Sequence, residues 1–349
     1  MSKTNPGNYF EDFRLGQKIV HATPRTVTAG DQALYVALYG SRFAVQSSDE
    51  FARAIGYARA PIDDLLTFHI VFGKTVPDVS LNAVANLGYA ECRFLAPVYP
   101  GDTLATTSEV IGLKENSNGK TGTVYVRSVG TNQRGEVVLS YVRWVMVRKG
   151  DEQAKIAEQL VPTLVAVVAP EQLGRALPKL ALSGWDNALA GSAHRFGDYA
   201  VGERIDHVDG MTVEESDHML ATRLYQNTAK VHFNQFTEAK GRFGRRLIYG
   251  GHVISLVRAL SFNGLGNSFH IAAINGGRHV APLFAGGTVH GWSEVLDKAD
   301  VPGQAGAGAL RLRSRATVDL PCAAFPTEDG KPGEAGVILD LDYWVVLPK

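Results

Sequence analysis

The chain has 349 residues, enough for two domains of ordinary size, and its 45% hydrophobic and 20% charged residues are typical of a soluble globular protein. Lys plus Arg and Asp plus Glu both number 35, and this zero net charge argues against a nucleic-acid partner. No apolar run approaches the roughly 18–20 residues that span a bilayer, and the N-terminal residues do not resemble a signal peptide. We therefore expect a cytoplasmic protein that does not bind membranes. The two cysteines, Cys92 and Cys322, argue against a disulfide framework and a cysteine metal site.

The sequence repeats itself. Residues 10–19 (FEDFRLGQKI) correspond to residues 196–205 (FGDYAVGERI), a shift of 186. After one deletion the shift becomes 185, and residues 93–110 then correspond to residues 278–295. Chance matches would scatter in offset, so one shift held over a hundred residues indicates a duplication.

Both halves show the same order of expected elements. Short helices are expected at residues 30–39 and 216–225, and longer apolar helices at 62–72 and 251–262. Val, Thr and aromatic residues in rough alternation predict the strands that follow, at 90–94, 103–113, 123–131 and 137–148, and at 277–281, 288–296, 309–320 and 337–347. Residues 151–190 are less patterned and contain three prolines, so we expect a connector there. The pattern favours an α+β fold in which each half wraps an antiparallel sheet around a long helix.

Residues 225–251 (YQNTAKVHFNQFTEAKGRFGRRLIYGG) carry the clearest chemistry of the chain. They resemble the MaoC-like hydratases of the hot-dog fold, whose signature places a histidine five residues after an aspartate. His232 falls on the family histidine and Asn227 on the family aspartate. The matching positions of the first half are Ser41 and Gln46, which perform no acid–base chemistry.

The resemblance implies a tandem, or double, hot-dog protein with one working site. Residues 1–150 would form a degenerate MaoC-like half, residues 151–190 the connector, and residues 191–349 the catalytic half. The run from residue 37 to residue 78 is most similar to family members that interconvert mesaconyl-CoA and β-methylmalyl-CoA. A general enoyl-CoA hydratase, an acyl-CoA thioesterase and a non-catalytic acyl-CoA-binding protein stay open as alternatives, since fold alone does not separate them.

The resemblance assigns three catalytic residues. His232 would be the general acid/base, because imidazole titrates near neutral pH. The N–H of Gly250, at a helix N-terminus, would stabilise negative charge on the thioester oxygen. Asn227 would orient water but cannot take a proton. A neutral amide also avoids electrostatic repulsion of the substrate's free carboxylate. For a gap of 4 Å, an aspartate would repel that carboxylate by about 1 kcal/mol in water and by about 4 kcal/mol at a dielectric of 20. The alternatives are a structural histidine, an ordinary helix-start glycine and a decayed site.

Binding of the acyl-CoA thioester is assigned to residues around the same helix start. Gly251 would allow close approach, Tyr249 would line the pocket, and Arg242, Arg245 and Arg246 would bind the CoA phosphates or the free carboxylate. The alternative for each arginine is a solvated surface position.

CoA is part of the substrate, and we expect no other cofactor and no metal. A homodimer is compatible with the resemblance. Asp63 and Asp64 are expected to stabilise a helix start.

Overall fold

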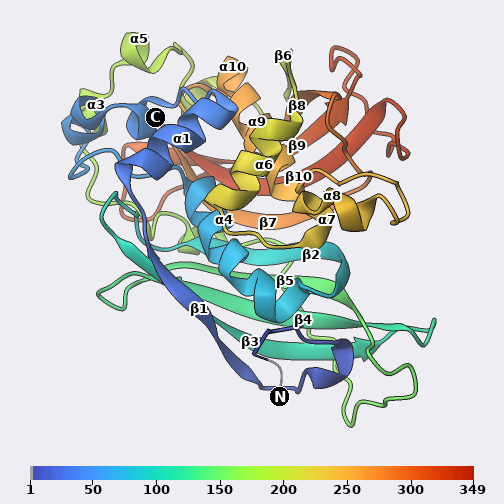
Figure 1. Ribbon diagram of the computed structural model, residues 1–349. Coiled ribbons are helices and arrows are strands. Elements are labelled where there is room, and N and C mark those ends of the chain that lie inside the picture. The colour runs from blue at the N-terminus through green and yellow to red at the C-terminus, as the bar shows by residue number, and fades with distance from the viewer. Residues whose placement is uncertain (1–2) are drawn as a thin grey trace.

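The computed structural model describes residues 3–349, which form one ten-stranded sheet with the order β1-β3-β4-β5-β2-β7-β10-β9-β8-β6 (Figure 1). The first half contributes β1 (Lys18–Thr26), α1 (Ala29–Tyr39), α2 (Ala44–Ser47), α3 (Asp49–Ala54), α4 (Asp64–Thr75), β2 (Ala83–Phe94), β3 (Thr103–Glu115), β4 (Thr121–Thr131) and β5 (Val137–Arg148). Helix α5 (Asn187–Ala190) forms the end of the connector. The second half contributes β6 (Arg204–Thr212), α6 (Glu215–Leu224), α7 (Lys230–Phe233), α8 (Gln235–Glu238), α9 (Gly250–Leu260), α10 (Phe262–Leu265), β7 (His270–His279), β8 (Thr288–Asp300), β9 (Ala307–Val318) and β10 (Gly336–Pro348).

The predicted α+β double hot-dog fold is confirmed, and all of the expected helices and strands are present. Strands β2 and β7 begin about seven residues earlier than predicted. The first residues of β7, HIAAI, are all buried, and no alternation of polar and apolar residues marks them as a strand. The prediction missed these residues because tertiary pairing, rather than local pattern, makes them extended.

The two halves join edge to edge through β2 and β7. These strands pair antiparallel from Tyr89 opposite Gly277 to Arg93 opposite Ala273, so the sheet of one half continues into the other. Figure 1 shows β2 and β7 in the middle of the molecule, with the first-half strands on one side and the second-half strands on the other. No sheet edge is left exposed between the halves.

The helices of the two halves meet at residues that the repeat relates to each other. Tyr39 at the end of α1 and Tyr225 after α6 share a hydrogen bond of 2.7 Å between their hydroxyls. His69 of α4 and Ser255 of α9 share one of 2.8 Å. Both pairs are separated by 186 residues, the shift of the duplication, so the contact is that of an internal dimer around a pseudo-two-fold axis.

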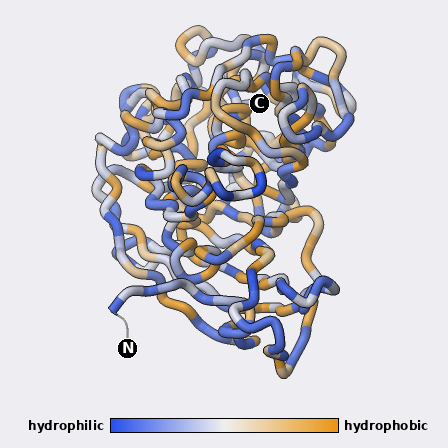
Figure 2. Tube along the Cα trace, turned by 45° about the vertical axis from the view of Figure 1, so that its right-hand side comes forward, coloured by the Kyte–Doolittle hydropathy of each residue, from blue (hydrophilic) through white to orange (hydrophobic). Residues whose placement is uncertain are grey.

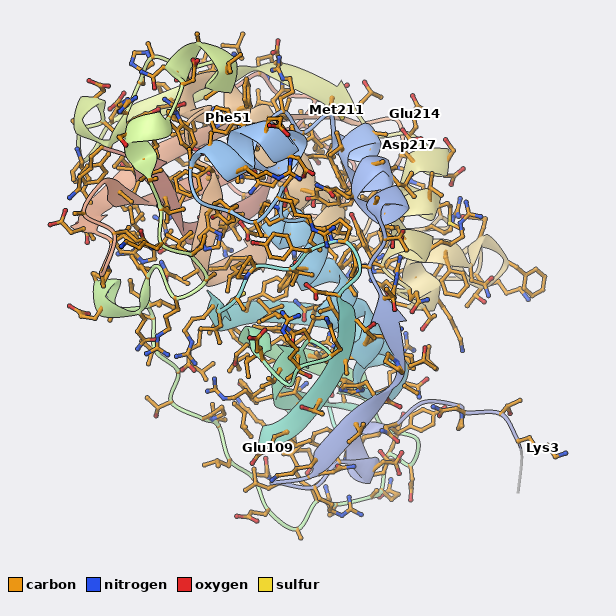
Figure 3. All side chains as sticks on the ribbon, turned by 90° about the vertical axis from the view of Figure 1, so that its left-hand side faces the viewer. Lys3, Phe51, Glu109, Met211, Glu214 and Asp217 are labelled. Atoms are coloured by element: carbon orange, nitrogen blue, oxygen red, sulfur yellow. The ribbon has the colours of Figure 1, made fainter. Side chains whose placement is uncertain are left out.

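Helices α4 and α9 form the core of the two halves. Leu65 to Thr75 of α4 and Gly251 to Leu260 of α9 are all buried, whereas α1 and α6 cover them and carry exposed residues. Figure 3 labels Met211, Glu214 and Asp217 where β6 passes into α6, and Glu109 on β3 beside β1. Figure 2 shows hydrophilic and hydrophobic stretches following one another along the chain. Within residues 3–349, every helix is too short or too polar to cross a bilayer.

The connector crosses from the first half to the second along the sheet. Leu160 forms a β-bridge with Leu113 of β3, and Val168 N–H donates to Asn275 of β7 at 2.8 Å. The ring of Trp185 then packs between Phe51 and Phe269. The connector is therefore an ordered part of both cores.

We predict that Gly73→Ala lowers the free energy of unfolding by about 1–3 kcal/mol or more, even though alanine has a higher helix propensity than glycine. A Cβ at Gly73 of α4 would lie 1.9 Å from the backbone oxygen of Tyr225, which precedes the segment that carries the predicted site. The matched control is Gly30→Ala in α1, where the nearest atom would be 3.4 Å away. Urea unfolding of both variants measures the difference. Equal stability of the two variants would show that the chain after α6 moves aside easily.

Candidate active site

The segment between α6 and α9 covers the N-terminus of α9. Helix α6 ends at Leu224, and Gln226 takes a positive φ of 54°, which turns the chain sharply. The N–H of Asn227 then donates to the carbonyl of Thr222 at 2.9 Å, which closes the turn. Further on, Leu247 N–H donates to Val231 O at 2.9 Å, so the segment folds back on itself. This hairpin-like path carries both family positions, Asn227 and His232.

His232 lies on the short helix α7, and its tautomer follows from one hydrogen bond. Its Nδ1 lies 3.0 Å from the carbonyl oxygen of Leu247, which only accepts, so Nδ1 carries the proton. Nε2 then holds a free lone pair and is the atom able to take a proton. Burial lowers the pKa of His232 to about 4, although the bond to Leu247 acts in the opposite direction. The ring is therefore neutral at pH 7, the form required of a general base.

The start of α9 presents free backbone donors. Tyr249 is the N-cap and makes no side-chain cap, and within residues 3–349 the N–H groups of Gly250 and Gly251 have no hydrogen-bond partner. The positive end of the helix dipole adds to these donors. The ring of His232 lies 5.4 Å from the ring of Tyr249, so base and donors are neighbours.

Glycine is required at both positions because side chains already fill the space. A Cβ at Gly250 would lie 2.4 Å from Cε1 and Nε2 of His279, the last residue of β7. A Cβ at Gly251 would lie 2.4 Å from the Tyr249 ring and 2.5 Å from the ring of His69. The two glycines thus let rings from both halves of the protein approach the first turn of α9.

Tyr249 lies beside His232, but its hydroxyl points into the core between the halves. Its hydroxyl is 3.4 Å from Nδ1 of His69, and its ring is 5.7 Å from that of Phe72. Its backbone N–H donates to Nε2 of His218 at 2.8 Å. That bond fixes the chain at the start of α9 and requires His218 to be neutral, and burial lowers the pKa of His218 accordingly.

Asn227 is 4% exposed and lines a cavity of about 450 Å³. Its Oδ1 accepts from Ala229 N–H at 3.1 Å, so the NH₂ group is the part left to bind a ligand. The same cavity is lined by Thr228 and by Lys74 of α4, so both halves contribute to it. Among the described residues, His232 is not part of this lining, and it faces the start of α9 instead.

The three predicted arginines lie in different environments. Arg246 forms an ion pair of 2.6 Å with Glu215 at the start of α6, so it holds the segment in place. Arg242 and Arg245 are exposed, and their guanidinium groups stack on Phe243 at 5.0 Å and on Phe284 at 3.8 Å. Only these two are accessible to a phosphate from solution.

The equivalent site in the first half is filled. Gln46, in the place of His232, donates to the carbonyl of Phe269 at 2.7 Å. Asp64 takes the place of Gly250, and its carboxylate accepts from Ile271 N–H at 2.8 Å and from His270 at 3.0 Å. The cavity there measures about 10 Å³, the size of about one water molecule. Asp63 caps α4 by accepting from Leu65 N–H, which agrees with the helix-stabilising interpretation.

Sequence reasoning missed His218 and His279. His218 lies one element before the motif, and nothing in its local sequence marks it. His279 did carry a signal, because the shift of 185 places it on Phe94 of the first half. The comparison of the two halves therefore shows a titratable ring in the second half where the first half has a phenylalanine.

Comparison with known proteins identifies the family and related chains. The family model described as mesaconyl-CoA hydratase matches residues 2–319. The chain is 61% identical to the beta-methylmalyl-CoA dehydratase of Chloroflexus aurantiacus, over 100% of this chain and 99% of that protein. It is also 61% identical to the mesaconyl-CoA hydratase of Cereibacter sphaeroides, over 99% and 100%.

Solved structures show the same architecture. A MaoC domain protein dehydratase from Chloroflexus aurantiacus superimposes with a TM-score of 0.96 at 61% identity, over 100% of this chain and 99% of that one. A Mycobacterium tuberculosis protein with a double hotdog fold, 24% identical, superimposes with a TM-score of 0.75 over 98% and 99%. The second likeness supports the fold alone.

We predict that the protein loses stability as the pH falls from about 6.5 toward 3. Burial lowers the pKa of His69 and His252 to about 3 and that of His207 to about 4. The unfolded chain binds protons at these groups from pH 6.5 downward, whereas the folded chain does not. Each group therefore costs about 2 kcal/mol of stability at pH 5. Urea unfolding at pH 7.5 and 5.0 measures the loss.

The control for this prediction is His194→Ala, since His194 is exposed. That variant should keep the same difference between the two pH values. A wild-type protein as stable at pH 5.0 as at pH 7.5 would contradict the neutral, buried state of the three histidines.

Proposed function

The chain belongs to the mesaconyl-CoA hydratase family, and from that premise we propose that it adds water to mesaconyl-CoA, forming β-methylmalyl-CoA, and catalyses the reverse dehydration at His232. The observation that best supports the proposed site is that a base held in one tautomer lies beside backbone N–H groups that have no hydrogen-bond partner within residues 3–349. His232 has its Nδ1 proton engaged by Leu247, and its ring neighbours the residue that precedes the unpaired N–H of Gly250. This arrangement supplies a proton acceptor and an oxyanion donor at one place.

The reaction follows from these two groups. Nε2 of His232 takes a proton from water while the water oxygen bonds to the β-carbon of the enoyl thioester. The C=C electron pair shifts toward the thioester, and the negative charge on its oxygen is held by the N–H of Gly250 and the dipole of α9. The imidazolium proton then passes to the α-carbon, which restores the thioester and the neutral His232. Dehydration runs through the same steps in reverse.

Asn227 contributes polarity without charge. Because its Oδ1 accepts from Ala229 N–H, its NH₂ group is left to donate to a water molecule or to the free carboxylate of the substrate. The carboxylate sits on the β-carbon, where a family aspartate would repel it. The neutral amide thus suits a dicarboxylic substrate better than an aspartate does.

The CoA part needs a route from solution to Gly250. The cavity of about 450 Å³ lined by Asn227 and Lys74 provides space beside the covering segment. Arg242 and Arg245 are exposed on that segment and offer guanidinium groups to the CoA phosphates. Arg246, paired with Glu215, would support the segment rather than bind the phosphates.

We predict that His232→Gln lowers kcat for mesaconyl-CoA by about 10²–10⁴, because proton transfer loses its acceptor. Loss of the enoyl-thioester ultraviolet absorbance measures turnover, with crotonyl-CoA as the second substrate. The control His194→Ala should retain full activity. A His232→Gln protein with wild-type turnover would remove His232 from the mechanism. A wild-type protein that binds both esters without turnover would be an acyl-CoA-binding protein.

We predict that Asn227→Asp lowers kcat/KM for mesaconyl-CoA far more than for crotonyl-CoA, which lacks the free carboxylate. A carboxylate–carboxylate distance of 4 Å costs about 4 kcal/mol at a dielectric of 20. The aspartate can still accept from Ala229 N–H, so the local fold should persist. Full activity of this variant on mesaconyl-CoA would refute the charge argument.

A further inference from the structure

We propose that His279 recognises the free carboxylate of the substrate by donating a hydrogen bond from Nε2. This inference rests on the proposed function and adds to it the residue that distinguishes a dicarboxylic thioester from a plain one. His279 belongs to neither family position, and the mechanism above does not use it.

The position of His279 is set by the sheet and by Gly250. It is the last residue of β7, and its ring packs edge-on against Tyr89 of β2 with 6.0 Å between centroids. A Cβ at Gly250 would lie 2.4 Å from Nε2 of His279, so Nε2 lies within about 4 Å of the Gly250 Cα once a carbon–carbon bond is added. The imidazole therefore borders the proposed oxyanion donor directly.

The Nε2 atom of His279 is buried and has no hydrogen-bond partner within residues 3–349. Buried polar atoms are nearly always satisfied, and an orphaned one costs about 1–3 kcal/mol. An orphaned side-chain nitrogen beside a thioester site points to a group that arrives with the ligand. Burial lowers the pKa of His279 to about 4, and repulsion from His232 when that ring is protonated acts in the same direction, so the His279 ring is neutral at pH 7.

The substrate places its carboxylate within reach of this nitrogen. In mesaconyl-CoA the carboxylate is bonded to the β-carbon, so its carbon lies only about 4 Å from the thioester carbon at ordinary bond lengths. A residue that recognises it must therefore lie next to the donor that holds the thioester oxygen. His279 meets that condition because it contacts Gly250.

The neighbouring cations are less suited to this role. Nζ of Lys74 is hydrogen-bonded to Gln226, and Arg246 is paired with Glu215. Arg143 of β5 is buried, but it donates to Thr75 at 2.7 Å and its guanidinium lies over the ring of Phe72, 4.3 Å from the centroid. These groups already have partners.

The inactive half supplies the test variant. Its equivalent of His279 is Phe94, which packs against His270 at 6.3 Å between ring centroids. A phenyl ring is thus compatible with the same place in the fold, and His279→Phe removes the donor while keeping a planar ring. His279→Gln keeps an N–H donor at a similar reach and serves as the conservative variant.

The experiment compares kcat/KM for mesaconyl-CoA and crotonyl-CoA in the wild type, His279→Phe and His279→Gln, all in the full chain. We expect His279→Phe to lose about 10–100-fold on mesaconyl-CoA, mainly through KM, and less than about 3-fold on crotonyl-CoA. His279→Gln should recover part of the loss. Equal losses on both substrates, or no loss on mesaconyl-CoA, would overturn the proposal.

A binding measurement keeps the test decisive if His279→Phe has no turnover. Succinyl-CoA carries a carboxylate at the same place and butyryl-CoA does not, and neither can be hydrated. The wild type should bind succinyl-CoA more tightly relative to butyryl-CoA than His279→Phe does, and an unchanged ratio would overturn the role of His279. A wild-type protein that hydrates only crotonyl-CoA would overturn the proposed function as well. A wild type that prefers mesaconyl-CoA, with His279→Phe keeping that preference, would overturn the His279 proposal alone.

Discussion

The pairing of β2 with β7 is the interaction on which the rest of the structure depends. It turns two sheets into one and sets the register between the halves, from Tyr89 opposite Gly277 to Arg93 opposite Ala273. That register brings Tyr89 against His279. A strand contact made mainly of backbone hydrogen bonds therefore decides which first-half side chains border the second-half site.

The first half retains the fold of a catalytic unit while its own site is closed. Asp64 stands where Gly250 stands in the second half, and its carboxylate takes the N–H of Ile271. Gln46 in the place of His232 donates to the carbonyl of Phe269. These polar groups stabilise the junction with β7. The positions that match the second-half site are thus occupied in the first half by side chains that hold the halves together.

Much of this arrangement was predictable from the sequence, because the duplication provided an internal comparison. The order of helices and strands, the α+β hot-dog fold and the lack of acid–base residues in the first-half motif follow from periodicity, the shift of 186 and the family resemblance. The early start of β7 was not predictable, since its buried residues show no alternation.

Within the site, the sequence could place His232 on the family position but not show its tautomer, which depends on the carbonyl of Leu247 fifteen residues later. Nor could the sequence show that Arg246 is ion-paired while Arg242 and Arg245 are exposed, because its partner Glu215 lies on the earlier helix α6. Spatial partners that are distant in sequence decided both points. The same holds for His279, because the sequence does not show that its Nε2 lies against Gly250 without a hydrogen-bond partner among the described residues.

The fusion of the halves has a consequence for how such a protein can change. In a dimer of identical chains, a substitution appears at both sites at once, so Asp in place of Gly250 would block both. In this chain the equivalent positions, Asp64 with Phe94 and Gly250 with His279, differ between the halves. A single covalent chain is released from that symmetry, so one half can acquire purely architectural residues while the other acquires selectivity for its substrate.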